Sequence, residues 1–140
     1  MRLATLVLFA LCACNDVRGF EGTWTGPRVG DTPALRQGVS MTASATLSID
    51  GIDTHGIRGH LSISGLVTNA EFVSVEGAEA DVLSGISFGG APLRVYLAFV
   101  AIGSAGEALA VIALYDHRIE VRVLRGGAEP LYAIFALAET

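Results

Sequence analysis

The side chains of this chain that are able to do metal or acid–base chemistry include three histidines: His55, His60 and His117. Imidazole nitrogens bind transition metals and transfer protons near neutral pH. His55 and His60 are an odd number of residues apart, so on one strand they would lie on opposite faces and chelate poorly. His117 follows Asp116 in a predicted two-residue turn. We therefore expect three surface histidines and no metal site.

Carboxylates and serines are the next candidates for chemistry. Four acids gather around one predicted hairpin: Glu71, Glu76, Glu79 and Asp81. A calcium loop needs regularly spaced oxygen ligands and glycines, which this segment lacks, so a solvated acidic edge is expected. Ser62 and Ser64 follow His60, but a flat strand does not expose a nucleophile. The sequence predicts neither an enzyme nor a cofactor.

Length and charge exclude further classes of protein. The 140 residues include nine arginines, no lysine and fourteen acids, and the formal net charge is −5. A nucleic-acid groove needs a dense positive surface, so nucleic acid is excluded as a partner. This length corresponds to one domain.

The first thirteen residues have the order of an export signal. An apolar run from Leu3 to Leu11 follows a short charged start and is too short to span a bilayer as a helix. An ordinary secretory signal has small residues at positions −3 and −1 of its cleavage site, whereas Leu11 is at −3 before Cys14. The alternatives are a secretory signal, a buried N-terminal segment, or a metal or redox pair formed by Cys12 and Cys14. The apolar run offers no complete set of metal ligands.

The stretch Leu11-Cys12-Ala13-Cys14 resembles the bacterial lipobox, in which a peptidase cuts before a cysteine that carries a diacylglyceryl group. The resemblance covers this segment alone, and it departs from the usual pattern in having Cys12 before Ala13. It implies a signal peptide over residues 1–13, lipid attachment at Cys14 and a short tether over residues 14–19. An exported protein, held by lipid to a membrane of the cell envelope on its periplasmic or surface side, is then expected.

Residues 20–140 have the periodicity of a single all-β domain. From Ser40 to Ile49, apolar side chains alternate with Ser and Thr without a break, which is typical of a half-buried strand. The uncharged Ser and Thr face is interpreted as a solvated outer face, with a hydrated interior or a surface for another strand as alternatives. Nine candidate strands follow one another with no gap for a crossover helix: 20–26, 40–49, 57–64, 70–76, 82–88, 93–102, 107–115, 118–124 and 131–137. This pattern predicts an antiparallel up-and-down meander of about eight or nine strands and favours a barrel over a sandwich.

The segment from Phe20 to Gly26 contains Gly22-Thr23-Trp24, which resembles the first strand of lipocalin- and avidin-type small β-barrels. The resemblance implies that Trp24 closes one end of a barrel and that an arginine of a late strand stacks on it. Arg118, Arg122 and Arg125 are candidates, and Arg122 is the one we choose. The chain has no other tryptophan and no lipocalin cysteine pair, so biotin is not implied. A tryptophan that plugs one end of any β core is the alternative.

Three C-terminal segments, 93–102, 107–115 and 131–137, are apolar on both faces. A monomeric antiparallel barrel should present polar outer positions, so something must cover the second face. The candidates are the segment from Pro27 to Gln37, a second copy of the chain and a partner protein. We expect a homodimer or partner surface that includes Tyr96, Val100 and Ile112.

Two roles from different classes fit these observations. The sequence favours a non-enzymatic structural or protein-interaction module of the cell envelope, and the alternative is a barrel that binds a small apolar ligand. The volume inside the barrel distinguishes them. Small residues predicted to face inward leave room for a ligand, namely Ala43, Ala45 and Ala101, whereas large ones fill the space, namely Leu47, Ile49, Leu61 and Phe99.

Overall fold

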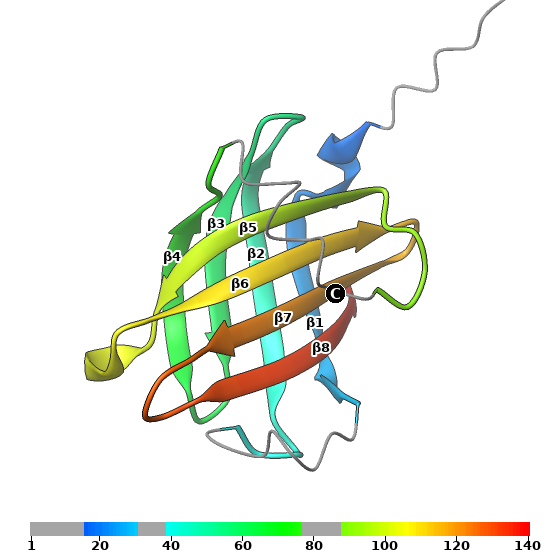
Figure 1. Cartoon of the computed structure of the whole chain (residues 1–140). Coiled ribbons are helices and arrows are strands. Elements are labelled where there is room, and N and C mark those ends of the chain that lie inside the picture. Colours follow the sequence, from blue (N-terminus) through cyan, green and yellow to red (C-terminus); the bar gives the residue numbers. More distant parts are fainter. Residues whose placement is uncertain (1–15, 31–38, 77–87) are drawn as a thin grey trace, which may run out of the picture.

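The computed structural model describes residues 16–30, 39–76 and 88–140 (Figure 1). A short 3-10 helix, η1 (Val17–Phe20), precedes eight antiparallel strands, and a second 3-10 turn, η4 (Gly103–Ala105), follows the fifth. The strands are β1 (Gly22–Val29), β2 (Ser44–Ile52), β3 (Ile57–Ile63), β4 (Val67–Val73), β5 (Arg94–Ala101), β6 (Glu107–Tyr115), β7 (Arg118–Arg125) and β8 (Leu131–Glu139). The prediction of an all-β antiparallel meander is confirmed.

The strands form one sheet in the order β4-β3-β2-β1-β8-β7-β6-β5, which curls into a nearly closed barrel (Figure 1). The first and last strands are neighbours, because β1 pairs with both β2 and β8. The two outermost strands, β4 and β5, meet through an isolated bridge between Ser74 and Ala98. Beside it, the Val75 N–H donates to the Leu97 carbonyl at 2.8 Å.

Several predicted strand boundaries differ from those observed, and the strand predicted at 70–76 lies at Val67–Val73. The chain enters the sheet at Gly22, after a helical turn, and not at Phe20. The second strand begins at Ser44, because the Ala43 N–H bonds to the Ser40 carbonyl and closes a turn there. The candidate strand at 82–88 lies outside the described residues except for Phe88, which is not in a strand.

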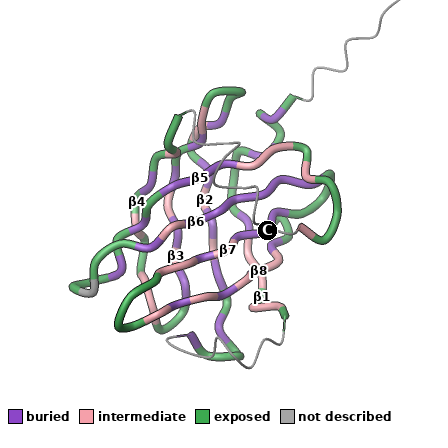
Figure 2. The backbone as a smooth tube through the Cα atoms, in the orientation of Figure 1, coloured by how far each residue is buried: buried purple, intermediate pink, exposed green. Residues whose placement is uncertain are grey.

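The interior of the barrel is filled by the inward-facing side chains of every strand. Buried residues alternate with half-buried or exposed ones along most of β2 and β3, as Figure 2 shows. The largest fully buried side chains include Leu47, Leu61, Ile63, Ile112, Ile119, Phe135 and Leu137. On the other face of β2, Ser44 is exposed and Thr46 and Ser48 are half-buried, so the Ser and Thr face points outward.

Glycines allow the strands to approach closely at two places in the barrel wall. A Cβ at Gly26 would overlap the carbonyl oxygen of Ala136 on β8, and one at Gly59 would overlap the carbonyl oxygen of Ser48 on β2. Because both obstacles are backbone atoms, no side-chain movement relieves the overlap. These two positions therefore set how tightly β1 packs on β8 and β3 packs on β2.

The residues expected at an interface lie inside the barrel. Tyr96, Val100 and Ile112 are 3%, 1% and 0% exposed and belong to the hydrophobic core. The interface prediction at these residues is therefore wrong, because two apolar faces give no local signal of which one points inward. On the outward face, Leu97 and Val111 are also buried within the single chain, at 4% and 0% exposure.

Candidate functional site

One end of the barrel is closed by η1 and Trp24. Trp24 is 4% exposed, and its ring stacks on that of Phe20 with centroids 5.6 Å apart. Its Nε1–H donates to the Phe20 carbonyl at 3.0 Å. Val17, at the start of η1, is buried beside them. Gly22 has φ of 129°, a conformation that favours glycine and joins η1 to β1.

Arg122 does not take part in this closure. Its neighbours Val121 and Val123 face the core, so Arg122 faces outward, on the opposite side of the sheet from Trp24. Its Nε donates to Glu120 Oε1 at 2.6 Å, and its guanidinium lies 5.0 Å from the centre of the Phe88 ring. The predicted stacking of Arg122 on Trp24 therefore does not form.

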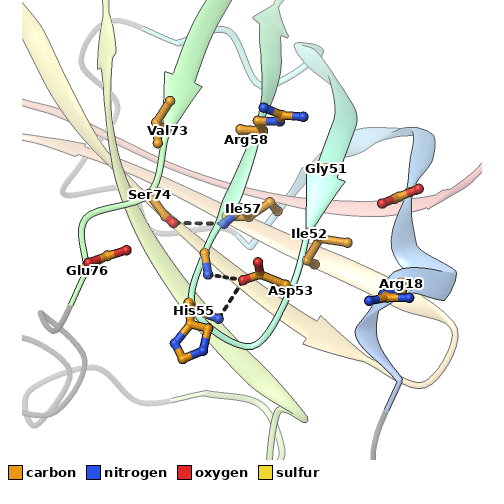
Figure 3. Close-up of a pocket in the computed structure, with 12 residues that line it drawn as sticks. Arg18, Gly51, Ile52, Asp53, His55, Ile57, Arg58, Val73, Ser74 and Glu76 are labelled. Atoms are coloured by element: carbon orange, nitrogen blue, oxygen red, sulfur yellow. Dashed lines mark hydrogen bonds between the residues drawn. The ribbon is translucent and has the colours of Figure 1, made fainter.

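An open pocket of about 500 Å³ lies at the same end of the barrel, beside η1 (Figure 3). Its walls come from η1, the hairpin between β2 and β3, and the end of β4. The lining residues are Arg18, Glu21, Gly51, Ile52, Asp53, His55, Gly56, Ile57, Arg58, Val73, Ser74 and Glu76. Ile52 and Ile57 are buried and provide an apolar floor.

Hydrogen bonds hold the β2–β3 turn that forms one wall of the pocket. Asp53 Oδ1 accepts the backbone N–H groups of His55 at 2.7 Å and Gly56 at 2.9 Å. These two bonds favour the ionised carboxylate, so they lower the pKa of Asp53 from its ordinary value. The Tyr96 hydroxyl donates to the Asp53 carbonyl at 2.7 Å, which ties the turn to β5.

The charged side chains around the pocket are not paired with one another. Arg18 and Arg58 have no ion-pair or side-chain hydrogen-bond partner among the described residues, and neither do Glu21 and Glu76. Ser74 Oγ accepts the Ile57 N–H at 2.8 Å, so this hydroxyl already has a structural role. The pocket thus carries exposed charges of both signs that no salt bridge among the described residues neutralises.

The three histidines lie apart. His55 is exposed at the pocket, and His60 lies on the outer face of β3 with its Nδ1 2.9 Å from Asp50 Oδ2. His117 is exposed in the β6–β7 turn. Within the described residues, no group of three or more His, Cys, Asp or Glu side chains is placed to hold a metal ion. Glu79 and Asp81 lie outside those residues, whereas Glu71 is exposed on β4.

A smaller open pocket of about 290 Å³ lies beside the β6–β7 turn and is lined by Tyr115, His117 and Arg118 among others. The Arg118 guanidinium lies 4.1 Å from the centre of the Tyr115 ring. The Tyr115 hydroxyl is buried and has no hydrogen-bond partner in the described part of the chain. Burial raises the pKa of this hydroxyl.

Sequence reasoning missed the larger pocket. Its charged residues come from segments tens of residues apart, and no local spacing connects Arg18 with Arg58 or Glu76. The only sequence feature at this place is the turn-forming segment from Asp50 to Thr54, which indicates a hairpin and no binding site.

Besides Ser62 and Ser64, the chain has a third candidate serine. Gly85, Ser87 and Gly89 have the Gly-x-Ser-x-Gly spacing of hydrolase nucleophiles. That motif acts at a sharp turn between a strand and a helix. The described residues contain strands and short 3-10 turns, and Ser87 lies outside them, so no catalytic role is assigned to it.

None of the helices in the described part of the chain is long and apolar enough to cross a membrane. Cys14 lies outside the described residues. No protein-family model, curated protein or solved structure matches the chain.

Proposed function

We propose that the chain is a lipid-anchored barrel of the bacterial cell envelope that acts as a non-enzymatic structural or protein-interaction module. The observation that carries this proposal is the filled interior. Phe135, Leu47 and Leu61 are fully buried inside the barrel, and Trp24 with Phe20 closes one end. The two pockets described above lie at the ends of the strands, beside the β2–β3 and β6–β7 turns, and not in the interior of the barrel.

The filled interior gives little support to the alternative of a small apolar ligand held inside the barrel. Two residues that the sequence predicted to face into the barrel face outward instead. Ala101 is exposed, and Phe99 is 54% exposed. The small residues Ala43 and Ala45 do face the core, where large neighbours occupy the space around them. Interiors packed in this way leave few voids larger than a water molecule.

The outer surface supports a role in interactions. Three exposed large hydrophobic side chains lie where β4 and β5 meet: Val73 at 65%, Val75 at 42% and Phe99 at 54% exposure. Because Ser74 and Ala98 are bridge partners, Val73 and Phe99 lie across from each other in that register. An apolar group that straddles two strands at the edge of a sheet is a suitable contact for another protein.

The position of η1 supports an anchor close to the fold. Packed structure begins at Val17, three residues after Cys14, and an extended chain spans at most roughly 3.5 Å per residue. A diacylglyceryl group on Cys14 would thus hold the η1 end of the barrel close to the membrane surface. This tether is shorter than the one expected from the sequence, because residues 17–19 belong to the fold.

Replacement of Cys14 by serine tests the anchor, with replacement of Cys12 as the matched control. Because the peptidase cuts before a lipid-bearing cysteine, we expect Cys14→Ser to leave the protein without fatty-acid label and with residues 1–13 uncut. Cys12→Ser should leave it in the membrane fraction, labelled by a radioactive fatty acid. A Cys14→Ser chain that still takes up the fatty acid, or that is cut to the same mature length as the wild type, would contradict the proposal.

The interaction role is tested by a photo-crosslinking residue placed at Phe99, with Met41 as the control. Met41 is 49% exposed but lies outside the strands, away from the junction of β4 and β5. We expect one discrete adduct in cells from position 99 and none from position 41. Native mass spectrometry that finds a stoichiometric apolar small molecule in the purified protein would favour the ligand-binding alternative instead.

A further inference from the structure

We propose that the outer surface where β4 and β5 meet docks an amphipathic helix of another protein. The apolar face of that helix would lie on Val73, Phe99 and Leu109, and lysine or arginine side chains along its border would lie beside Glu71 and Glu107. This inference deepens the interaction role proposed above and rests on it for the existence of a protein partner.

An apolar row crosses neighbouring strands on the outside of the barrel. Val73 on β4 lies across from Phe99 on β5, and Phe99 is the register partner of Leu109 on β6. Val73 and Phe99 are 65% and 54% exposed, and Leu109 is half-buried. Figure 1 shows β4 and β5 coming together at this side of the barrel. The row continues to the half-buried Leu124 on β7, so it is a continuous apolar group and no scattered set of residues.

The core of the barrel is filled without these side chains. The inward positions beside them are taken by Phe72 on β4 and by Ala98 and Val100 on β5, all of which belong to the core. Successive side chains of a strand point to opposite faces, so Val73 and Phe99 are directed away from that core. Folding of the single chain therefore leaves them in water, and their burial by a partner is favourable.

Negative charge borders the apolar row along one side. Glu71 is two residues before Val73 on β4, and Glu107 is two residues before Leu109 on β6, so each glutamate shares the outer face with its apolar neighbour. Both glutamates are exposed, and neither has an ion-pair partner among the described residues. Their carboxylates are therefore able to accept donors from a partner without breaking an existing ion pair.

The arginine next to this row in the sheet extends away from it. Arg58 on β3 is the register partner of Val73. A Cβ added at Gly51 on β2 would lie 2.8 Å from Arg58 Nε, so the arginine side chain extends over β2, on the far side of β3 from Val73. Arg58 therefore does not neutralise the acidic border.

The charge of the border selects the kind of partner. Lysine or arginine beside the docked apolar face would pair with Glu71 and Glu107. A second copy of the chain carries the same acidic border and the same net charge of −5, so like charges would approach each other. An anionic lipid surface would be repelled for the same reason. A basic segment of a different protein is thus the favoured occupant.

The geometry favours a helix over an added strand. β4 is an edge strand of the sheet, but Asn69 in it has φ of 48°, and its register against β3 shifts between Leu61 and Ile63. An irregular edge of this kind disfavours pairing with another strand. Three neighbouring strands span about 10 Å, which is close to the distance of about 10.5 Å between helix positions i and i+7. One apolar stripe of a helix therefore reaches Val73, Phe99 and Leu109 together.

Two synthetic helical peptides test the docking surface. Each has about 18 residues with leucine along one face, and the border positions are lysine in one peptide and glutamate in the other. The full-length chain carries a photo-crosslinking residue at position 99, with position 41 as the control. It is used as cells produce it, in phosphatidylcholine nanodiscs if it carries lipid, and peptide bound to lipid affects both positions equally.

We expect the lysine peptide to form an adduct from position 99 with half-saturation at about 100 µM or below, and none from position 41. The glutamate peptide should need at least about a tenfold higher concentration, because its border is repelled. Equal half-saturation by the two peptides would overturn the basic partner. Equal adducts from the two positions, or no adduct at all, would overturn the docking surface.

Charge variants test the acidic border. The double variant Glu71→Gln with Glu107→Gln should raise the half-saturation concentration of the lysine peptide about fivefold, since it removes two surface ion pairs. The double variant Glu21→Gln with Glu139→Gln is the matched control, because it makes the same change of net charge at exposed sites at the η1 end of the barrel. Equal effects of the two double variants would overturn the border, since net charge alone would then explain them.

The adduct expected in cells from position 99 separates this inference from the proposed function. In the Glu71→Gln and Glu107→Gln background, that adduct should fall about fivefold, whereas the Glu21→Gln and Glu139→Gln background should retain it. An adduct that neither background changes would leave the interaction role intact and overturn the basic partner, and an adduct with a second copy of the chain would do the same. No adduct in the unaltered background would overturn the interaction role and this inference with it.

Discussion

Replacement of Phe20 by alanine should open the end of the barrel that η1 closes. The Phe20 side chain is 8% exposed, and its ring stacks on Trp24 at 5.6 Å with an interplanar angle of 27°. The hydrogen bond from Trp24 Nε1 goes to the backbone carbonyl of Phe20, so alanine retains the acceptor. The substitution therefore tests the packing of the ring alone.

The expected cost follows from these contacts. Burial of a phenylalanine side chain contributes roughly 1.5–3 kcal/mol to the free energy of unfolding. A stacked aromatic pair adds roughly 0.5–1.5 kcal/mol beyond burial. Because the site is at the end of the barrel, where neighbours are able to relax, we expect a loss of about 3 kcal/mol. With a urea m-value of about 2 kcal/mol/M, the midpoint should fall by about 1.5 M.

Trp24 is the only tryptophan, so its fluorescence reports on this end of the barrel during urea unfolding. In Phe20→Ala, the emission of the folded state should also shift to longer wavelength as water reaches the indole. Phe99→Ala is the control with the same chemistry, because Phe99 is 54% exposed and should lose less than about 0.5 kcal/mol. Equal losses in the two variants, or an unshifted emission in Phe20→Ala, would refute the closure by η1.

Further predictions concern close backbone packing, two tyrosines and one carboxylate. Gly26→Ala should cost more than about 2 kcal/mol, because its Cβ overlaps the backbone of β8, whereas Gly19→Ala, with open space around it, should be nearly neutral in urea unfolding. Tyr96→Phe removes a hydrogen bond of 2.7 Å and should cost about 1 kcal/mol, whereas Tyr115→Phe removes a buried hydroxyl with no partner among the described residues. The Tyr115 variant should unfold at the same or a slightly higher urea concentration, and a loss equal to that of Tyr96→Phe would show that its hydroxyl is bonded. The pKa of Asp53 is held below its ordinary 3.8 by two backbone N–H donors, so the stability it contributes is present above pH 3.8. That contribution is lost as pH falls through the lower, folded-state pKa, and a carboxyl NMR titration with a midpoint at or above 3.8 would contradict these bonds.

Strand locations and the meander were predictable from sequence because the period of a strand is local. Alternation from Ser40 to Ile49 placed Leu47 inward and the Ser and Thr face outward, and the structure has both. On β7, Arg118, Glu120 and Arg122 alternate with the core residues Ile119, Val121 and Val123, so the charged side chains lie on the outer face. In these strands one face is polar, and the cost of burying unpaired polar groups decides the orientation.

The orientation of β5 and β6 was decided by the tertiary structure. Both faces of these strands are apolar, so burial of either face would remove a similar apolar area from water. A shift of the strand by one residue would turn Phe99 inward and Val100 outward. Closure of the sheet places Val100 in the core at 1% exposure and leaves Phe99 at the surface. On β7, Val121 and Val123 face the core, so Arg122 lies on the outer face, away from Trp24.

Sequence alone determined the fold class, the order of the strands and the segment that resembles a lipid-anchor signal, because each depends on neighbours along the chain. The closed barrel end and the pocket depend on contacts between distant segments. Arg18, Arg58 and Glu76 line one pocket because η1 lies beside the β2–β3 hairpin and β4 ends next to it. Periodicity specifies which side of a strand a residue occupies, whereas the closure of the sheet specifies which residues face each other across a pocket.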